Sequence, residues 1–120
     1  MTAPAKAPAI PPLFRAALKA AGLPMPEMEL QFHPTRKWRF DYGWWSYWST
    51  PDGTIRRPAV ALEVQGGLFV NGRHSRGAAL LKEHEKLSEA AALGWRILFC
   101  TPQNLCSAEN IDRIKRALEA

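Results

Sequence analysis

The sequence predicts an α/β fold with the element order α-β-β-β-α-β, followed by one further helix near the C-terminal end. In the first half of the chain, apolar and polar residues alternate along short stretches, as they do in strands with one buried face. In the second half, a long stretch with helical spacing separates the third apolar run from a fourth. Helices packed on a mixed sheet of about four strands give a compact α/β sandwich.

The N-terminal part of the chain contains a tail, a helix and a strand. Residues 1–10 are rich in Pro and Ala, and we expect them to be a disordered tail. Residues 11–120 then form a single domain. Apolar residues at helical spacing predict a helix over 13–21, which Gly22 ends. After a connector rich in proline, residues 29–32 alternate as a half-buried strand does.

Two longer strands follow and form a hairpin. The first has an aromatic face, which consists of Trp38, Phe40, Tyr42 and Trp44. Asp41 lies on its opposite, polar face. The segment 49–54 contains Pro followed by Asp-Gly and is a predicted turn. Residues 58–65 are mostly apolar and predict a central strand, with Glu63 and Gln65 on the same face.

The second half predicts a loop over 68–77, a helix from about 75 to 93, a strand over 95–99 and a last helix over 108–118. The apolar stripe of the long helix consists of Leu80, Leu81, His84, Leu87, Ala91 and Ala92. Gly94 caps this helix at its C-terminal end, and Ser107 caps the start of the last helix.

Charge and composition narrow the class of partner and the compartment. The net charge is +5 and the pI about 9.6, which favours anionic partners such as nucleic acid. No window approaches the ~18 apolar residues of a membrane span, and the start lacks the apolar core of a secretory signal. Cys100 and Cys106 are the only cysteines, which predicts two reduced thiols and no structural zinc. We therefore expect a cytoplasmic protein that does not enter a membrane.

Three carboxylates, Glu29, Asp41 and Glu63, fall on predicted strands. If the strands of Asp41 and Glu63 are neighbours, their polar faces can converge beside Gln65. Adjacent carboxylates repel, and both stay ionised at neutral pH only when a cation lies between them. Mg²⁺ is the natural cation, since it takes oxygen ligands from one or two carboxylates together with phosphates and water. Such an ion polarises a phosphoryl oxygen and activates a bound water.

The arrangement of an aspartate strand, a hairpin, Glu63-Val64-Gln65, a helix and a strand resembles the PD-(D/E)XK nuclease superfamily. More narrowly, FHPTRKWRFDYGW…ALEVQGG…GRHSRG…LKEHEK…AALGWRILFCTP is similar to small phage and prophage nucleases related to archaeal-type Holliday junction resolvases. The similarity covers residues 29–102. It implies a restriction-endonuclease-like core, a phage or bacterial origin, and a Mg²⁺-dependent endonuclease that resolves four-way DNA junctions. Mn²⁺ is expected to substitute for Mg²⁺.

Carried over residue by residue, the resemblance makes Asp41 and Glu63 metal ligands and matches Glu29 to an upstream acidic residue of many members. Gln65 occupies the position of the usual lysine. Its amide can orient a water but cannot accept a proton as a base.

The general base is therefore open. Lys86, in the EHEK run of the long helix, is the first candidate; the competing interpretation, which helical spacing favours, is a surface lysine that pairs with Glu83 or Glu89. The alternatives are a metal-bound hydroxide that needs no side-chain base, and His74.

Basic residues cluster next to the proposed site and suggest which residues contact DNA. The predicted DNA-binding residues are Arg36, Arg39, Arg73, His74 and Arg76, whose role is to position the phosphate backbone. A homodimer is expected, because a four-way junction has near two-fold symmetry and a C2 dimer matches it. The hairpin aromatics pack locally or cover that dimer seam; they are Trp44, Trp45, Tyr47 and Trp48.

Two other functions compete with the junction resolvase. The glutamine at position 65 also fits a non-catalytic DNA-binding module on a decayed nuclease scaffold. A nonspecific or mismatch-type nicking nuclease could use the same fold.

Overall fold

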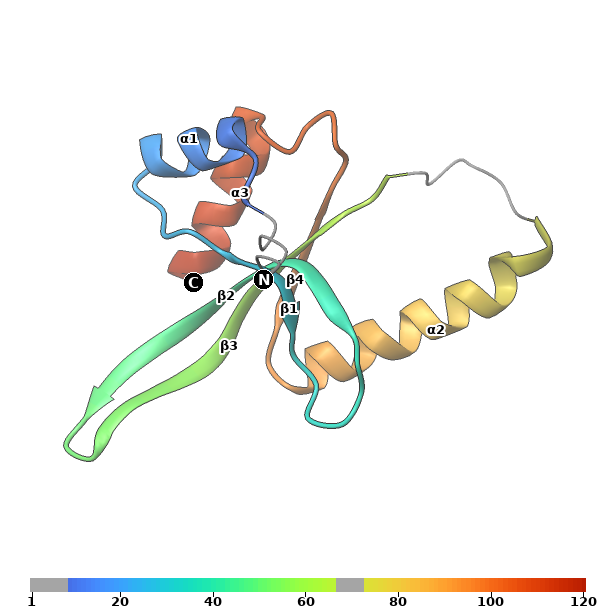
Figure 1. Cartoon of the computed structure of the whole chain (residues 1–120), viewed down its shortest axis with the longest axis horizontal. Helices are drawn as coiled ribbons and strands as arrows, with labels where there is room; N and C mark the ends of the chain where they lie inside the picture. The colour runs from blue at the N-terminus through green and yellow to red at the C-terminus, as the bar shows by residue number, and fades with distance from the viewer. Residues whose placement is uncertain (1–8, 67–72) are drawn as a thin grey trace, which may run out of the picture.

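The computed structural model describes the backbone of residues 9–66 and 73–120, and all of their side chains except those of 73–76. The elements are α1 (Pro12–Ala20), β1 (Glu27–Gln31), β2 (Arg39–Thr50), β3 (Gly53–Val64), α2 (Arg73–Ala92), β4 (Arg96–Cys100) and α3 (Ala108–Glu119). The predicted α-β-β-β-α-β order and the C-terminal helix are thus confirmed (Figure 1). None of the helices in the described ranges is long and apolar enough to cross a membrane.

The four strands form one mixed sheet in the order β1-β2-β3-β4. β1 and β3 run antiparallel to β2, whereas β4 runs parallel to β3. Parallel neighbours need a crossover, and α2 lies in the connection between them. In Figure 1, α1 and α3 lie together against one side of the sheet, and α2 extends away from it.

Two apolar clusters cover the two faces of the sheet. The larger joins α1 and α3 to the sheet; its buried members are Ile10, Phe14, Leu18, Tyr42, Trp44, Val60, Leu62, Cys100, Ile111 and Ile114. The smaller lies on the α2 side; its buried members are Leu30, Phe32, Phe40, Ala61, Ala90 and Trp95. Ile10 belongs to the expected tail but is buried in the core, whereas residues 1–8 lie outside the described part of the chain.

The prediction that Phe40, Tyr42 and two tryptophans share one face of β2 is wrong. Phe40 packs in the smaller cluster, while Tyr42 belongs to the larger cluster on the other face. The alternation breaks at Asp41, opposite a distortion in β1 where Glu29 has φ 50°. The β1 pairs on either side of this residue are Met28 with Tyr42 and Leu30 with Phe40. Strict alternation requires a continuous ladder, and the ladder is interrupted here.

Gly43 in β2 shows how closely the first two strands pack. A Cβ atom at this position would lie 2.6 Å from Cδ1 and 3.3 Å from Cβ of Leu30. Leu30 is fully buried and cannot move aside cheaply. The absence of a side chain at residue 43 therefore lets β1 lie against β2 beside the candidate site.

The β2–β3 hairpin is longer than predicted. Pairing continues to Thr50 and Gly53, so the turn contains only Pro51 and Asp52 instead of the whole segment 49–54. Gly53 has φ 133°, a conformation that glycine adopts without strain. The pairing of β1 with β2 ends at Gly43, and that of β4 with β3 begins at Val60. Residues 45–58, called the hairpin arm below, therefore project beyond the sheet as a two-stranded ribbon (Figure 1).

The long helix α2 differs from the prediction in its start and in its buried face. It begins at Arg73, within the segment expected to be a loop. The predicted apolar stripe is largely exposed, with Leu80 51% and Leu81 70% accessible. The face that packs on the sheet instead carries Lys86 and Ala90, because only the C-terminal half of α2 reaches the sheet.

Candidate active site

The candidate site lies where β2 and β3 separate. The last backbone pair of these strands is Tyr42 with Leu62. Beyond this pair, hydrogen bonds from backbone N–H groups to side-chain carboxylates take the place of backbone–backbone hydrogen bonds. The N–H of Val64 donates to Oδ2 of Asp41 at 2.7 Å, and the N–H of Asp41 donates to Oε2 of Glu63 at 3.2 Å. Each carboxylate thus satisfies a backbone donor that the interrupted ladder leaves open. The structure brings these two predicted site residues side by side.

Glu63 is the more buried of the two carboxylates, at 5% exposed. It lies on the face of the sheet that α2 covers, and its Oε1 accepts a hydrogen bond from Nζ of Lys86. The Lys86 side chain is 13% exposed, and its Nζ lies 5.6 Å from the ring centroid of Phe40. Burial raises the pKa of Glu63, while Lys86 and the N–H of Asp41 act in the opposite direction. The lysine is therefore the main compensation for a nearly buried negative charge.

This contact identifies the acidic partner of Lys86. Its acidic partner is Glu63 on β3, not Glu83 or Glu89 on its own helix. Glu89 contacts His33 instead. A lysine from the crossover helix thus reaches the carboxylate pair from the side.

Glu29 is not part of this group. It is exposed and lines a separate pocket of about 410 Å³ together with Arg15 and Arg39. Among the side chains of residues 9–66 and 77–120, no three from His, Cys, Asp or Glu gather closely enough to hold a metal ion. The described site therefore consists of two carboxylates and a lysine.

Gln65 follows directly after β3 and is half-buried. Its backbone N–H donates to the carbonyl oxygen of Cys100 at 2.7 Å, which continues the contact with β4 for one more residue. The position that the resemblance matches to a lysine thus lies at the end of the central strand, bonded to β4.

The predicted DNA-binding residues are dispersed. Arg36 donates to Oε1 of Glu85 at 2.7 Å and stacks over Trp38 at 4.0 Å, which ties it to α2. Arg39 is exposed at the start of β2. The backbones of Arg73, His74 and Arg76 lie in the first turns of α2, but their side chains fall outside the described residues.

The sequence did not predict two contacts between the β1–β2 loop and α2, His33 with Glu89 and Arg36 with Glu85, which are called the clamp below. Nδ1 of His33 accepts the backbone N–H groups of Thr35 at 3.2 Å and Arg36 at 3.0 Å. Because Nδ1 is an acceptor, the ring proton belongs on Nε2, which lies 3.0 Å from Oε1 of Glu89. With the contact between Arg36 and Glu85, this gives two links from the loop to α2, one on each side of Lys86 in the sequence. The feature of the sequence that could have predicted these contacts is a pair of glutamates one helical turn apart, Glu85 and Glu89, together with His33 and Arg36 in the predicted loop.

Searches among family models, curated proteins and solved structures found no match to this chain. The resemblance to the PD-(D/E)XK superfamily is therefore an expectation from the motifs. Any functional conclusion depends on those motifs and on the geometry of the carboxylates and Lys86.

Proposed function

We propose that this protein is a metal-dependent DNA endonuclease that hydrolyses phosphodiester bonds and resolves four-way junctions. The observation that carries the proposal is the meeting of Asp41, Glu63 and Lys86 at the point where β2 and β3 separate. The α-β-β-β-α-β order supports it, because this order places a hairpin, a central strand and a crossover helix around the carboxylates. The cytoplasm, where DNA and free Mg²⁺ are both present, is the compartment that we propose for it.

The donor set fits a hard divalent cation. Mg²⁺ commonly takes one or two protein carboxylates and completes its coordination with water and phosphate oxygens. Asp41 and Glu63 would hold the ion, with the backbone carbonyl of Val64 as a further oxygen donor. When bound, Mg²⁺ or Mn²⁺ polarises a phosphoryl oxygen and makes water easier to deprotonate.

The residues of the chain then have distinct roles. Lys86 places a positive charge beside the carboxylates, where it can stabilise negative charge that develops on the phosphate. Gln65 can orient the attacking water through its amide but cannot remove its proton. The three candidates for the general base are those that the sequence left open: Lys86, a hydroxide that needs no side-chain base, and His74.

A cleavage assay tests the proposal. Wild-type protein with Mg²⁺ is expected to cut a synthetic four-way junction faster than flapped, nicked or linear duplex DNA. Asp41→Asn should reduce cleavage by more than ~100-fold, because it removes a charged ligand, and should leave DNA binding intact. Asp112→Asn is the matched control, since Asp112 is an exposed residue of α3 paired with Arg116. Failure of the wild type to cut any DNA form across a range of Mg²⁺ and Mn²⁺ concentrations would refute the enzyme.

A non-catalytic DNA-binding module is the second candidate, and the glutamine at position 65 favours it. This module would bind junctions without any effect of Mg²⁺ or of Asp41→Asn. Calorimetry separates the two, because the enzyme should bind Mg²⁺ or Mn²⁺ and lose that binding in Asp41→Asn. Mapping the products on junction and mismatched substrates would identify a nonspecific or mismatch-type nickase.

A further inference from the structure

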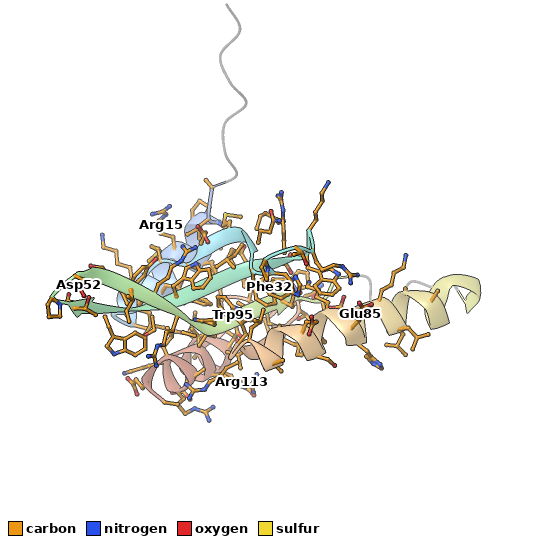
Figure 2. All side chains as sticks on the ribbon, turned by 90° about the horizontal axis from the view of Figure 1, so that it is seen from below. Arg15, Phe32, Asp52, Glu85, Trp95 and Arg113 are labelled. Atoms are coloured by element: carbon orange, nitrogen blue, oxygen red, sulfur yellow. The ribbon has the colours of Figure 1, made fainter. Side chains whose placement is uncertain are left out.

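The hairpin arm projects from the same two strands that carry the candidate site. From the Tyr42–Leu62 pair beside the carboxylates to the Thr50–Gly53 pair at the tip of the arm, β2 extends for eight residues. At about 3.4 Å per residue, the tip lies ~25 Å from the carboxylates. Within the described chain neither β1 nor β4 pairs with the arm, so both of its edges are open. Figure 2 shows Asp52 at the tip, at the opposite end of the molecule from Glu85 on α2.

Each face of the arm carries an arginine stacked on a tryptophan. Cζ of Arg56 lies 4.0 Å from the ring centroid of Trp45, and Cζ of Arg57 lies 5.0 Å from that of Trp48. The two arginines are neighbours on β3 and therefore point to opposite faces. The register places both arginines in the paired part of the ribbon. Tyr47, opposite Arg56, adds an exposed aromatic ring.

The two guanidinium groups are available to an external partner. Among the described residues, neither Arg56 nor Arg57 forms a salt bridge or a side-chain hydrogen bond. Stacking on an indole ring fixes the plane of a guanidinium but leaves its N–H groups at the edge, where they can donate to phosphate. Asp52 is the one acidic residue of the arm, which leaves an excess of positive charge.

We propose that the hairpin arm enters the major groove of duplex DNA, with Arg56 and Arg57 donating to the phosphates on either side. The major groove admits a two-stranded ribbon, and arginines on opposite faces match the two backbones that border it. A second copy of the chain fits less well, because isologous contact would bring the arginines of both arms together. The choice of DNA as partner rests on the proposed function.

The arm also makes a prediction about distance. At 3.4 Å per base pair, a tip ~25 Å from the carboxylates contacts DNA about seven base pairs from the cut. The arm would therefore measure the length of a duplex arm that leads away from a junction. This gives the protein a contact to duplex DNA that is separate from the cleavage site.

The test is a binding titration of the full chain on a synthetic four-way junction, in EDTA, over a range of salt concentrations. The double variant Arg56→Gln/Arg57→Gln should weaken binding by at least ~10-fold and reduce the slope of log K against log salt by about 2. It should also lose hydroxyl-radical protection about five to six base pairs from the cut, because Arg57 and Arg56 lie five and six residues, or ~20 Å, from Leu62. Arg113→Gln/Arg116→Gln is the matched control, because it removes the same charge from α3, where both arginines pair with acidic residues of their own helix.

The possible outcomes distinguish the proposed DNA contact of the hairpin arm from the proposed endonuclease activity. An arm variant with unchanged affinity, salt slope and footprint overturns the role of the arm, even if the wild type cleaves junctions. An arm variant that only loses dimerisation in sedimentation overturns it as well, in favour of a contact between copies. If the wild type never cleaves but the arm variant loses affinity and footprint, the proposed enzyme fails and the role of the arm stands.

Discussion

Asp41 shows how a residue type that strands disfavour is accommodated in one. Asp is depleted in strands because its carboxylate does not suit a half-buried pleated surface. Here the carboxylate accepts the N–H of Val64 at the point where the backbone ladder stops. The side chain therefore takes the place of a missing backbone acceptor and links β2 to β3 beyond their last backbone pair.

Lys86 offers a test of the electrostatics at the same scale. Lys86→Met removes the cation that lowers the pKa of Glu63, so burial alone acts and the pKa rises further. The pKa of a glutamate in an unfolded chain is about 4.3. When the pKa is higher in the folded state, the carboxyl contributes to stability while it is protonated, at low pH, and this contribution is lost as pH rises. We expect a loss of about 3 kcal/mol at pH 8 and a smaller loss at pH 5, measured by urea unfolding.

Lys82→Met is the control for this change, since Lys82 is exposed on the same helix. It should alter the free energy of unfolding by less than about 0.5 kcal/mol at either pH. An equal loss at pH 5 and pH 8 in Lys86→Met would show that the pair contributes packing and no charge compensation.

At the scale of elements, the placement of α2 depends on few contacts. Of its described side chains, only Ala90 is fully buried, and the residues around Leu80 are exposed. The clamp from the β1–β2 loop supplies directional contacts through His33 and Arg36. Because these contacts flank Lys86 in the sequence, they fix the rotation of the helix about its axis and hence the side to which the lysine points.

His33→Ala tests whether the loop positions the helix. It removes the acceptor for two backbone N–H groups and the link to Glu89, and should cost about 1–2 kcal/mol. Hydrogen exchange should rise in residues 33–36 and in the C-terminal half of α2.

The matched control for the clamp is His84→Ala, because His84 is an exposed residue of α2. Glu89→Gln keeps an acceptor oxygen and should have a smaller effect than His33→Ala. Unchanged exchange in α2 of His33→Ala would mean that packing alone orients the helix.

At the scale of the whole molecule, one chain has a single pair of site carboxylates, whereas resolving a junction requires two cuts. A C2 dimer supplies both sites with the symmetry of the substrate. We therefore expect the junction complex to contain two chains, each of 13.4 kDa, by sedimentation equilibrium. Two symmetric nicks per junction should accompany it.

The arm variant Arg56→Gln/Arg57→Gln is a useful comparison here, since it should remain a dimer while it binds DNA more weakly. A complex with one chain per junction, or products with one nick only, would contradict the dimer.

The local features of the fold could be predicted from the sequence because they depend on neighbours in the chain. Ser107 caps α3 as expected, and its Oγ accepts the N–H of Asn110 at 3.1 Å. Gly94 ends the helical region with φ 105°. The faces of β2 and α2 could not be predicted correctly, since they depend on a break in the ladder at Asp41 and on how little of α2 meets the sheet.

The order of the elements and the pairing of the strands that carry Asp41 and Glu63 follow from local sequence, because consecutive strands joined by a short turn pair with each other. Three features appear only in the folded chain: Lys86 contacts Glu63, Glu29 lines a separate pocket, and Arg56 and Arg57 lie on a projecting ribbon. These outcomes depend on the rotation of a helix and the length of a hairpin. Contacts between residues far apart in the chain set both, and no local pattern records them.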